Sequence, residues 1–262
     1  MLLAVTVHRS FVVVTGIWRS VLDVAKLGTR RGRLSELMHD PTAHSSAIAR
    51  DAMRDRVYGD VVYTALLDLF KPGERVLDIG CGTGAWVPVL RDNGAQTIVG
   101  IEFATSAADQ AEPRCDRLVR KPVETVELSD LGGQSFDTII AADVLEHLVD
   151  PWRELHRWTG WAAPGAQLVV SVPNLRYFEI VRSLLKGRFD YSDQSGLMDR
   201  THLRWFTRQS LTDDLEAAGW QPVVWGLPDR ITTPRRRQFD RATLGRCGEF
   251  FTWQLRVVAQ LR

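Results

Sequence analysis

The sequence predicts an α/β fold in which a doubly wound, mostly parallel sheet of about seven strands is covered by helices. Three observations predict it. Short apolar runs alternate with helical stripes along the chain. The first apolar run ends in an acid followed by glycines, as a strand–turn–helix unit does. The chain then ends in two apolar runs without an intervening helical stripe, and we expect the last strand to be antiparallel.

The elements follow from periodicity and from turn residues. Apolar positions repeat at helical spacing in five stretches, at 47–70, 86–90, 104–111, 152–161 and 211–218. Short, nearly continuous apolar runs predict strands at 76–79, 98–101, 117–119, 136–143, 166–173, 223–225 and 253–261. Glycines at 94 and 219 end two of the helices, and Pro164-Gly165 is expected to form the turn before the fifth strand.

The composition is typical of a globular domain. The chain has 262 residues, of which 45% are hydrophobic and 25% charged, with a net charge of +1. This suits one sizeable domain with an ample core and argues against a protein built mainly to bind nucleic acid. Cys81, Cys115 and Cys247 are odd in number and far apart, with no metal-ligand spacing. We therefore expect a reducing, cytoplasmic setting.

Residues 1–46 are expected to form an N-terminal extension, and 47–262 the main domain. Residues 1–24 are apolar-rich, but His8, Arg9 and Arg19 interrupt them, and no run reaches the ~20 residues of a membrane span. We expect this segment to be an accessory strand and helix packed on the domain, or to result from a start codon assigned too early. A peripheral helix that contacts a membrane or a partner is the alternative.

A glycine-rich turn follows the first strand. Gly80, Gly82 and Gly84 let the backbone turn tightly and approach a ligand. Asp78 stands directly before them, and an anion there suits a cationic ligand better than a pyrophosphate. Glu102 ends the second strand, about where an acid would hold a ribose hydroxyl pair. A glycine-rich turn without a ligand is the alternative.

With these residues the chain resembles the class I S-adenosylmethionine-dependent methyltransferases, whose sheet is Rossmann-like. The resemblance implies that the glycine loop cradles the methionine part of the cofactor and that the second acid holds its ribose. It places Val123 and Glu124 beside the adenine, and Arg56 and Tyr58 near the cofactor's carboxylate. The expected cofactor-binding set is Tyr58, Asp78, Gly80, Cys81, Gly82, Gly84, Glu102, Phe103, Val123 and Asp143.

A second polar cluster follows the fourth strand. Asp143, Glu146 and His147 lie at the edge where open α/β sheets bind ligands, and His202 lies in a segment without apolar periodicity. An alcohol needs a base or a metal to lose its proton, so a histidine beside an acid points to O-methylation. The plainer explanations are an acid favoured by a helix dipole and a histidine that fills a polar pocket.

Two further resemblances refine this cluster. From residue 58 to 261 the chain looks like bacterial methyltransferases of glycan and polysaccharide biosynthesis. The acid-x-x-Glu-His arrangement, followed later by a histidine, is similar to the metal site of small-RNA 3′-end 2′-O-methyltransferases, and ubiquinone-pathway O-methyltransferases carry a related cluster. The implied ligands are Glu146, His147 and His202, whereas Asp143 stands where the RNA enzymes have Glu. Such mixed ligation suits Mg²⁺ or Mn²⁺.

The resulting hypothesis is a sugar O-methyltransferase with metal- or histidine-assisted deprotonation. Asp143, Glu146, His147 and His202 form its catalytic set, and Tyr191, Arg200 and Arg204 contact the acceptor. Excursions 174–206 and 228–250 are expected to be lids, the second rich in arginine. The acceptor is a carbohydrate or another small hydroxyl compound. The alternatives are RNA 2′-O-methylation, methylation of a quinone-type small molecule, and a non-catalytic cofactor-binding protein.

Overall fold

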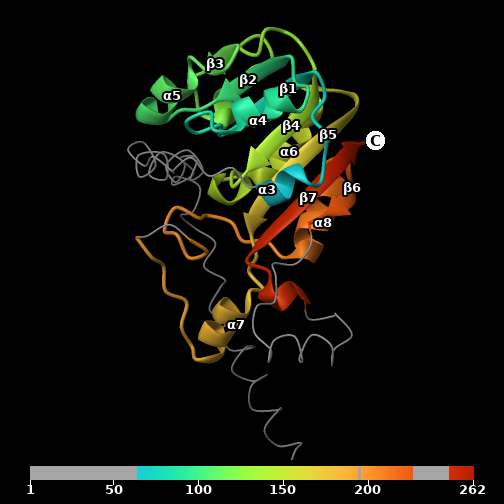
Figure 1. Cartoon of the computed structure of the whole chain (residues 1–262). Coiled ribbons are helices and arrows are strands. Elements are labelled where there is room, and N and C mark those ends of the chain that lie inside the picture. The colour runs from blue at the N-terminus through green and yellow to red at the C-terminus, as the bar shows by residue number, and fades with distance from the viewer. Residues whose placement is uncertain (1–63, 194–195, 227–247) are drawn as a thin grey trace, which may run out of the picture. The chain divides into compact units, whose positions relative to one another are not determined.

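The computed structural model describes residues 64–193, 196–226 and 248–262, all of which belong to a compact unit that spans Thr42–Arg262 (Figure 1). The expected N-terminal extension, most of helix 47–70 and most of excursion 228–250 lie outside the described residues. Within the described part, no helix combines the length and the apolar character that a membrane crossing requires.

A seven-stranded sheet organises the domain, with the order β3-β2-β1-β4-β5-β7-β6. The first five strands are parallel, and β7 is antiparallel to both of its neighbours, β5 and β6. The predicted fold class is therefore confirmed. The strands are β1 (Arg75–Ile79), β2 (Thr97–Ile101), β3 (Arg117–Val119), β4 (Phe136–Ala142), β5 (Ala162–Pro173), β6 (Trp220–Trp225) and β7 (Gln254–Leu261).

Helices connect the strands. They are α3 (Thr64–Leu67), α4 (Trp86–Asp92), α5 (Thr105–Ala111), α6 (Pro151–Thr159), α7 (Phe178–Leu185) and α8 (Arg208–Ala217), and the short 3₁₀ turns are η2 (Val123–Thr125), η3 (Leu145–His147) and η4 (Gly248–Phe251). The predicted helices at 86–90, 104–111 and 211–218 correspond to α4, α5 and α8.

Alternate residues of each central strand pack on opposite faces of the sheet. Val76 of β1 belongs to a core cluster with Leu66 of α3 and Leu90 of α4. Leu77, the next residue, belongs to a second cluster with Leu155 of α6 and Leu211 of α8. Since both faces are covered, the central strands are apolar throughout, which is the pattern that made them recognisable in the sequence.

The prediction of a turn at Pro164-Gly165 before the fifth strand is wrong. Both residues lie inside β5, which begins at Ala162, and α6 ends earlier than predicted. The pairing between β4 and β5 shifts between Phe136 and Thr138, and Gly165 has a φ of +73°. A bulge at a left-handed glycine therefore carries the strand through a sequence that is typical of a turn.

The excursion from 174 to 206 contains α7, which the sequence analysis did not predict. Both ends of this excursion stay at the sheet edge, because Asn174 bridges Phe206 and the Leu175 amide donates to the Phe206 carbonyl at 2.9 Å. Whether the excursion acts as a lid stays a prediction.

Strand order fixes where a ligand would lie. β1 pairs with β2 on one side and with β4 on the other, so the chain reverses its winding between β1 and β4. In open α/β sheets the crevice at such a point, beyond the carboxyl ends of the strands, is the usual binding site. The glycine loop and the turn after β4 both lie at this crevice.

Candidate active site

The glycine loop between β1 and α4 is a tight left-handed turn. Gly80, Gly82 and Gly84 have φ values of +66°, +55° and +77°, which favour glycine. A Cβ on Gly80 would lie 2.9 Å from the Cγ2 of Val144, so this loop touches the turn after β4. A Cβ on Gly82 would have no atom within 4 Å, which leaves open space beside the loop for a ligand.

Asp78 lies at the carboxyl end of β1, where only 2% of it is exposed. Its Oδ2 atom is buried and has no hydrogen-bond partner. Burial raises the pKa of this carboxyl well above its usual value, and the nearby Cys115 and Glu102 raise it further. A buried carboxylate without a partner is costly, so this position suits a ligand that carries a positive charge or a donor.

Glu102 follows β2 and supports the loop. Its Oε2 accepts from the Gly82 amide at 3.0 Å, and its Oε1 accepts from the Ala104 amide at 2.7 Å. Burial raises the pKa of Glu102, and the hydrogen bonds from Ala104 and Gly82 oppose that rise. The acid thus fixes the loop against the end of β2, at the position predicted for ribose binding.

The other residues predicted to bind the cofactor differ in burial, and two of them lie outside the described residues. Cys81 is buried beneath the loop, Val123 is 7% exposed in η2, and Phe103 follows Glu102 with an intermediate exposure. Tyr58 and Arg56 lie outside the described residues. The contacts of all these residues with a cofactor stay predictions.

The turn after β4 has an unusual backbone at Asp143, whose φ of +57° is the one positive value recorded for a non-glycine residue in the described ranges. Its Oδ1 accepts from the Ser171 hydroxyl at 3.0 Å and from the Gln254 amide. These contacts tie the turn to β5 and β7. The turn then forms η3 rather than the start of a longer helix.

Glu146 in η3 is 1% exposed, and neither of its carboxylate oxygens has a hydrogen-bond partner. Burial raises the pKa of this carboxyl well above its usual value, followed by the charge of Asp143. Buried carboxylates are normally paired. The two unpartnered oxygens of Glu146 are therefore available to a cation or to a hydrogen-bond donor.

Two imidazoles lie beside this acid. The His147 and His202 rings meet edge to face with centroids 4.9 Å apart, and ligand atoms of these residues and Glu146 lie within 4.8 Å of one another. His147 Nδ1 lies 3.2 Å from the Thr201 carbonyl, and His202 Nδ1 lies 3.1 Å from the Leu197 carbonyl. Because a carbonyl only accepts, each Nδ1 is the donor in these contacts, and in a neutral ring the lone pair is then on Nε2. Histidines that bind metal ions are usually oriented in this way.

Backbone contacts bring these distant segments together. The amides of Leu203 and Arg204 both donate to the Glu146 carbonyl, at 2.7 and 3.0 Å. The buried Asp199 accepts from the Thr201 amide and hydroxyl at 2.9 and 2.8 Å, which shapes the turn before His202. The predicted cluster of Glu146, His147 and His202 is thus assembled in space, while its chemical role is not tested.

The predicted acceptor residues have other contacts. Arg200 forms an exposed ion pair with Asp193 at 3.0 Å. The Arg204 guanidinium donates to the Val149 carbonyl and lies over the Trp152 ring. Tyr191 packs with Phe189 and Trp205, and the Trp205 ring in turn contacts His202. Their roles in acceptor binding stay predictions.

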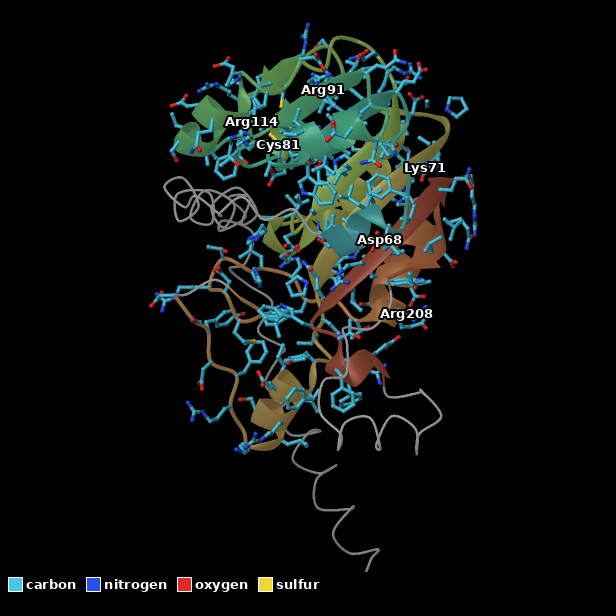
Figure 2. All side chains as sticks on the ribbon, viewed as in Figure 1. Asp68, Lys71, Cys81, Arg91, Arg114 and Arg208 are labelled. Carbon is cyan, nitrogen blue, oxygen red and sulfur yellow. The ribbon has the colours of Figure 1, made fainter. Side chains whose placement is uncertain are left out.

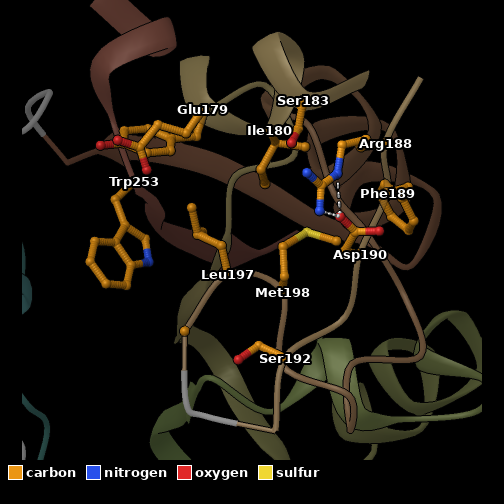
Figure 3. Close-up of a pocket in the computed structure, with 12 residues that line it drawn as sticks. Glu179, Ile180, Ser183, Arg188, Phe189, Asp190, Ser192, Leu197, Met198 and Trp253 are labelled. Carbon is orange, nitrogen blue, oxygen red and sulfur yellow. Dashed lines mark hydrogen bonds and ion pairs between the residues drawn. The ribbon is translucent and has the colours of Figure 1, made fainter. Parts of the chain in front are cut away.

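A pocket that the sequence analysis missed lies beside this cluster (Figure 3). It has a volume of about 360 Å³, and its wall combines apolar side chains such as Ile180 of α7, Leu197 and Trp253 with the charged Arg188 and Asp190. Leu197 joins it to the cluster, since its carbonyl holds His202. The spacing of Phe178, Val181 and Leu185 could have revealed the helix that forms one side of it.

Comparison with known proteins shows the family. A family described as "Methyltransferase domain" matches residues 49–224, more than half of the chain. The chain is 29% identical over 133 residues to a ubiquinone biosynthesis O-methyltransferase of Coxiella burnetii, covering 46% of this chain and 56% of that protein. It is 28% identical over 175 residues to a protein of the same name from Dinoroseobacter shibae, covering 60% and 69%. The chain thus spans only about half the length of the Coxiella relative.

The fold is also found in solved structures. Magnesium protoporphyrin IX methyltransferase from Synechocystis PCC 6803, solved with bound S-adenosylhomocysteine, superposes with a TM-score of 0.54, with 15% identity over 84% of this chain and 98% of that one. The family match, the sheet order and the glycine loop agree with one another. The chain belongs to the methyltransferase domain family and is an enzyme of the class I methyltransferases, with S-adenosylmethionine as its cofactor.

Proposed function

We propose that this enzyme methylates a hydroxyl group of a small, quinone-type molecule, and that Glu146, His147 and His202 bind a divalent cation that assists deprotonation. The observation that carries the proposal is Glu146, a fully buried acid with two unpartnered oxygens beside two oriented imidazoles. A sensor that only binds the cofactor has no need of such a group.

The cofactor is expected to lie along the glycine loop. Gly82 leaves open space there, Asp78 offers a buried unpartnered oxygen, and Glu102 follows β2 beside the loop. When bound, S-adenosylmethionine supplies an electrophilic methyl group. The turn after β4 lies against the same loop through Val144, so an acceptor held at Glu146 and the histidines would face the donor.

The residues of the cluster fit a divalent cation. One carboxylate and two imidazoles form a mixed oxygen and nitrogen donor set, which suits Mg²⁺ or Mn²⁺ in an open site. A cation held there would lower the pKa of the acceptor's hydroxyl. The Thr201 and Leu197 carbonyls orient the two rings, and Glu146 would balance part of the added charge.

The acceptor class rests on the relatives. Both reported relatives are named ubiquinone biosynthesis O-methyltransferases, which favours the quinone-type alternative over the sugar acceptor suggested by the sequence. The neighbouring pocket offers Ile180, Leu197 and Trp253 as apolar contacts for a ring or an alkyl group.

Methyl transfer from labelled S-adenosylmethionine to a panel of phenols, catechols and sugars tests the proposal. We expect the catechols to be methylated, the activity to be lost on chelation, and Mn²⁺ or Mg²⁺ to restore it. The His147→Ala and His202→Ala variants should lose about 10²–10⁴-fold in rate and bind less Mn²⁺ in equilibrium dialysis. The matched control is His156→Ala, an exposed histidine on α6.

Each outcome bears on a different part of the proposal. Full activity in both histidine variants would remove the cluster from catalysis. Activity that withstands chelation but falls in the His147→Ala variant would replace the metal by His147 acting as a base. Methylation of sugars alone would overturn the acceptor class and leave O-methylation standing.

A further inference from the structure

Two cysteines meet beneath the glycine loop. Cys81 belongs to the loop itself, and Cys115 lies in the turn before β3 (Figure 2 labels Cys81). A Cβ built on Gly100 would lie 2.7 Å from the Cys81 sulfur and 3.0 Å from the Cys115 sulfur, so both thiols pack against the same point of β2. Both cysteines are free thiols, and the Cys81 thiol donates to the Gly82 carbonyl at 3.9 Å.

The two thiols differ in environment. Cys81 is 5% exposed, whereas Cys115 is only partly buried. The neighbouring Cys81 thiol lowers the pKa of Cys115; burial and the charge of Asp116 oppose this, and the positive charges of Arg91 and Arg114 lower the pKa further. The neighbouring Cys115 thiol and burial raise the pKa of Cys81. The accessible member of the pair is therefore the better nucleophile.

Both cysteines are held through backbone hydrogen bonds. Cys115 donates its amide to the Ala111 carbonyl at 3.1 Å, and the adjacent Asp116 donates its amide to the Ile98 carbonyl at 3.0 Å and accepts from the Ile98 amide at 2.7 Å. Cys81 donates its amide to the Ile101 carbonyl at 3.1 Å and accepts from the Gly84 amide at 2.8 Å. Because Cys81 belongs to the glycine loop, any movement of Cys81 toward Cys115 also moves the loop.

We infer that Cys81 and Cys115 form a reversible disulfide that weakens cofactor binding. With glutathione disulfide as oxidant, the Cys115 thiolate attacks one sulfur and releases a first glutathione thiolate. The Cys81 thiolate then attacks the Cys115 sulfur of the mixed disulfide and releases the second. Two protein thiols are oxidised and one glutathione disulfide is reduced to two glutathiones.

The disulfide acts on the cofactor through the loop. An S–S bond is about 2.05 Å long, shorter than any contact between two thiols, so closure draws Cys81 toward Cys115. The next residue, Gly82, donates to Glu102 at 3.0 Å, and this contact sets the loop against the predicted ribose acid. A misplacement of about 1 Å in a site can cost about 10²-fold in rate. We therefore expect a shift of the loop to lower the affinity for the cofactor at least about tenfold.

The test uses the full chain with Cys247→Ser, which leaves only the two thiols of interest. The protein is equilibrated in glutathione buffers, remaining thiols are alkylated, and peptides joined through Cys81 and Cys115 are identified by mass spectrometry. Calorimetry then measures S-adenosylhomocysteine binding to the oxidised and reduced forms. The matched control is Cys115→Ser, with Cys115→Ala as a second variant, and oxidation should leave the affinity of either unchanged.

Binding and oxidation are reciprocally linked. If the disulfide weakens S-adenosylhomocysteine binding tenfold, saturating S-adenosylhomocysteine favours the dithiol form tenfold and should raise the midpoint reduction potential by about 30 mV for two electrons. This readout needs no variant at position 115. Absence of the linked peptide in the most oxidising buffer, or a complete disulfide with unchanged affinity and midpoint, would overturn the inference.

Discussion

Replacing Asp78 by asparagine should make the free enzyme more stable and its cofactor binding weaker. Asp78 is 2% exposed with an unpartnered Oδ2, and its pKa is raised by burial and then by Cys115 and Glu102. Between the unfolded pKa of about 3.9 and the raised folded pKa, the folded chain binds more protons than the unfolded chain. The free energy of unfolding therefore falls as pH rises through that window, and the Asp78→Asn variant loses this fall.

The expected magnitudes follow from burial. An unsatisfied buried group costs about 1–3 kcal/mol, and for a domain of this size each kcal/mol moves the melting temperature by about 2–4 °C. At pH 8 the Asp78→Asn variant without cofactor should thus melt about 2–12 °C above the parent. Loss of one partner of a buried charge pair costs about 2 kcal/mol or more, so affinity for S-adenosylmethionine should fall about 30-fold.

Differential scanning calorimetry from pH 5 to pH 8.5 measures the first effect, and isothermal titration calorimetry with S-adenosylmethionine measures the second. The matched control is Asp137→Asn, since Asp137 of the neighbouring strand is half-buried and paired with Arg75 at 2.7 Å. That variant should be less stable and retain its affinity. The reasoning fails if the Asp78→Asn variant binds as tightly as the parent, or if it keeps the parent's decline in stability with pH.

Two further predictions concern the fold around the site. The Gly80→Ala variant should lose more stability than the Gly133→Ala variant. Both glycines have left-handed φ values, +66° and +68°, so the backbone strain of about 1–2 kcal/mol is common to the two variants. Only the Cβ at position 80 would also meet an atom, the Val144 Cγ2 at 2.9 Å, and equal melting temperatures of the two variants would contradict this clash. The Trp220→Phe variant should lose about 1–3 kcal/mol in urea unfolding, since Trp220 Nε1 donates to the Leu155 carbonyl at 3.0 Å, and an unchanged midpoint would argue against that bond.

The sheet could be predicted because its signals are local. Val76, Leu77 and Ile79 form an apolar strand, interrupted only by Asp78, with both faces buried, and the glycines after it have few alternatives to a tight turn. Pro164-Gly165 shows the limit of such reasoning. The pair reads as a turn, yet a register shift between β4 and β5 places it within a strand, and register is a property of two strands rather than of one sequence.

The site was predicted in its residue types but not in its supports. The hydrogen bonds from Leu203 and Arg204 to the Glu146 carbonyl bring His202 to His147, and no periodicity indicates a backbone contact between segments so far apart in the chain. Likewise, nothing in the sequence indicates that Asp143 takes a left-handed conformation and contacts Ser171. Such long-range contacts depend on the assembled sheet.

Glu146 and the two histidines are proposed to form a cation-dependent deprotonation site. The most direct measurement is Mn²⁺ binding, followed by methyl transfer to a catechol in the same sample, for the parent and the Glu146→Gln variant. We expect one bound Mn²⁺ and activity proportional to its occupancy in the parent, with both lost in the variant while S-adenosylhomocysteine still binds. Rapid methyl transfer by the Glu146→Gln variant, in the presence of chelator, would contradict the account.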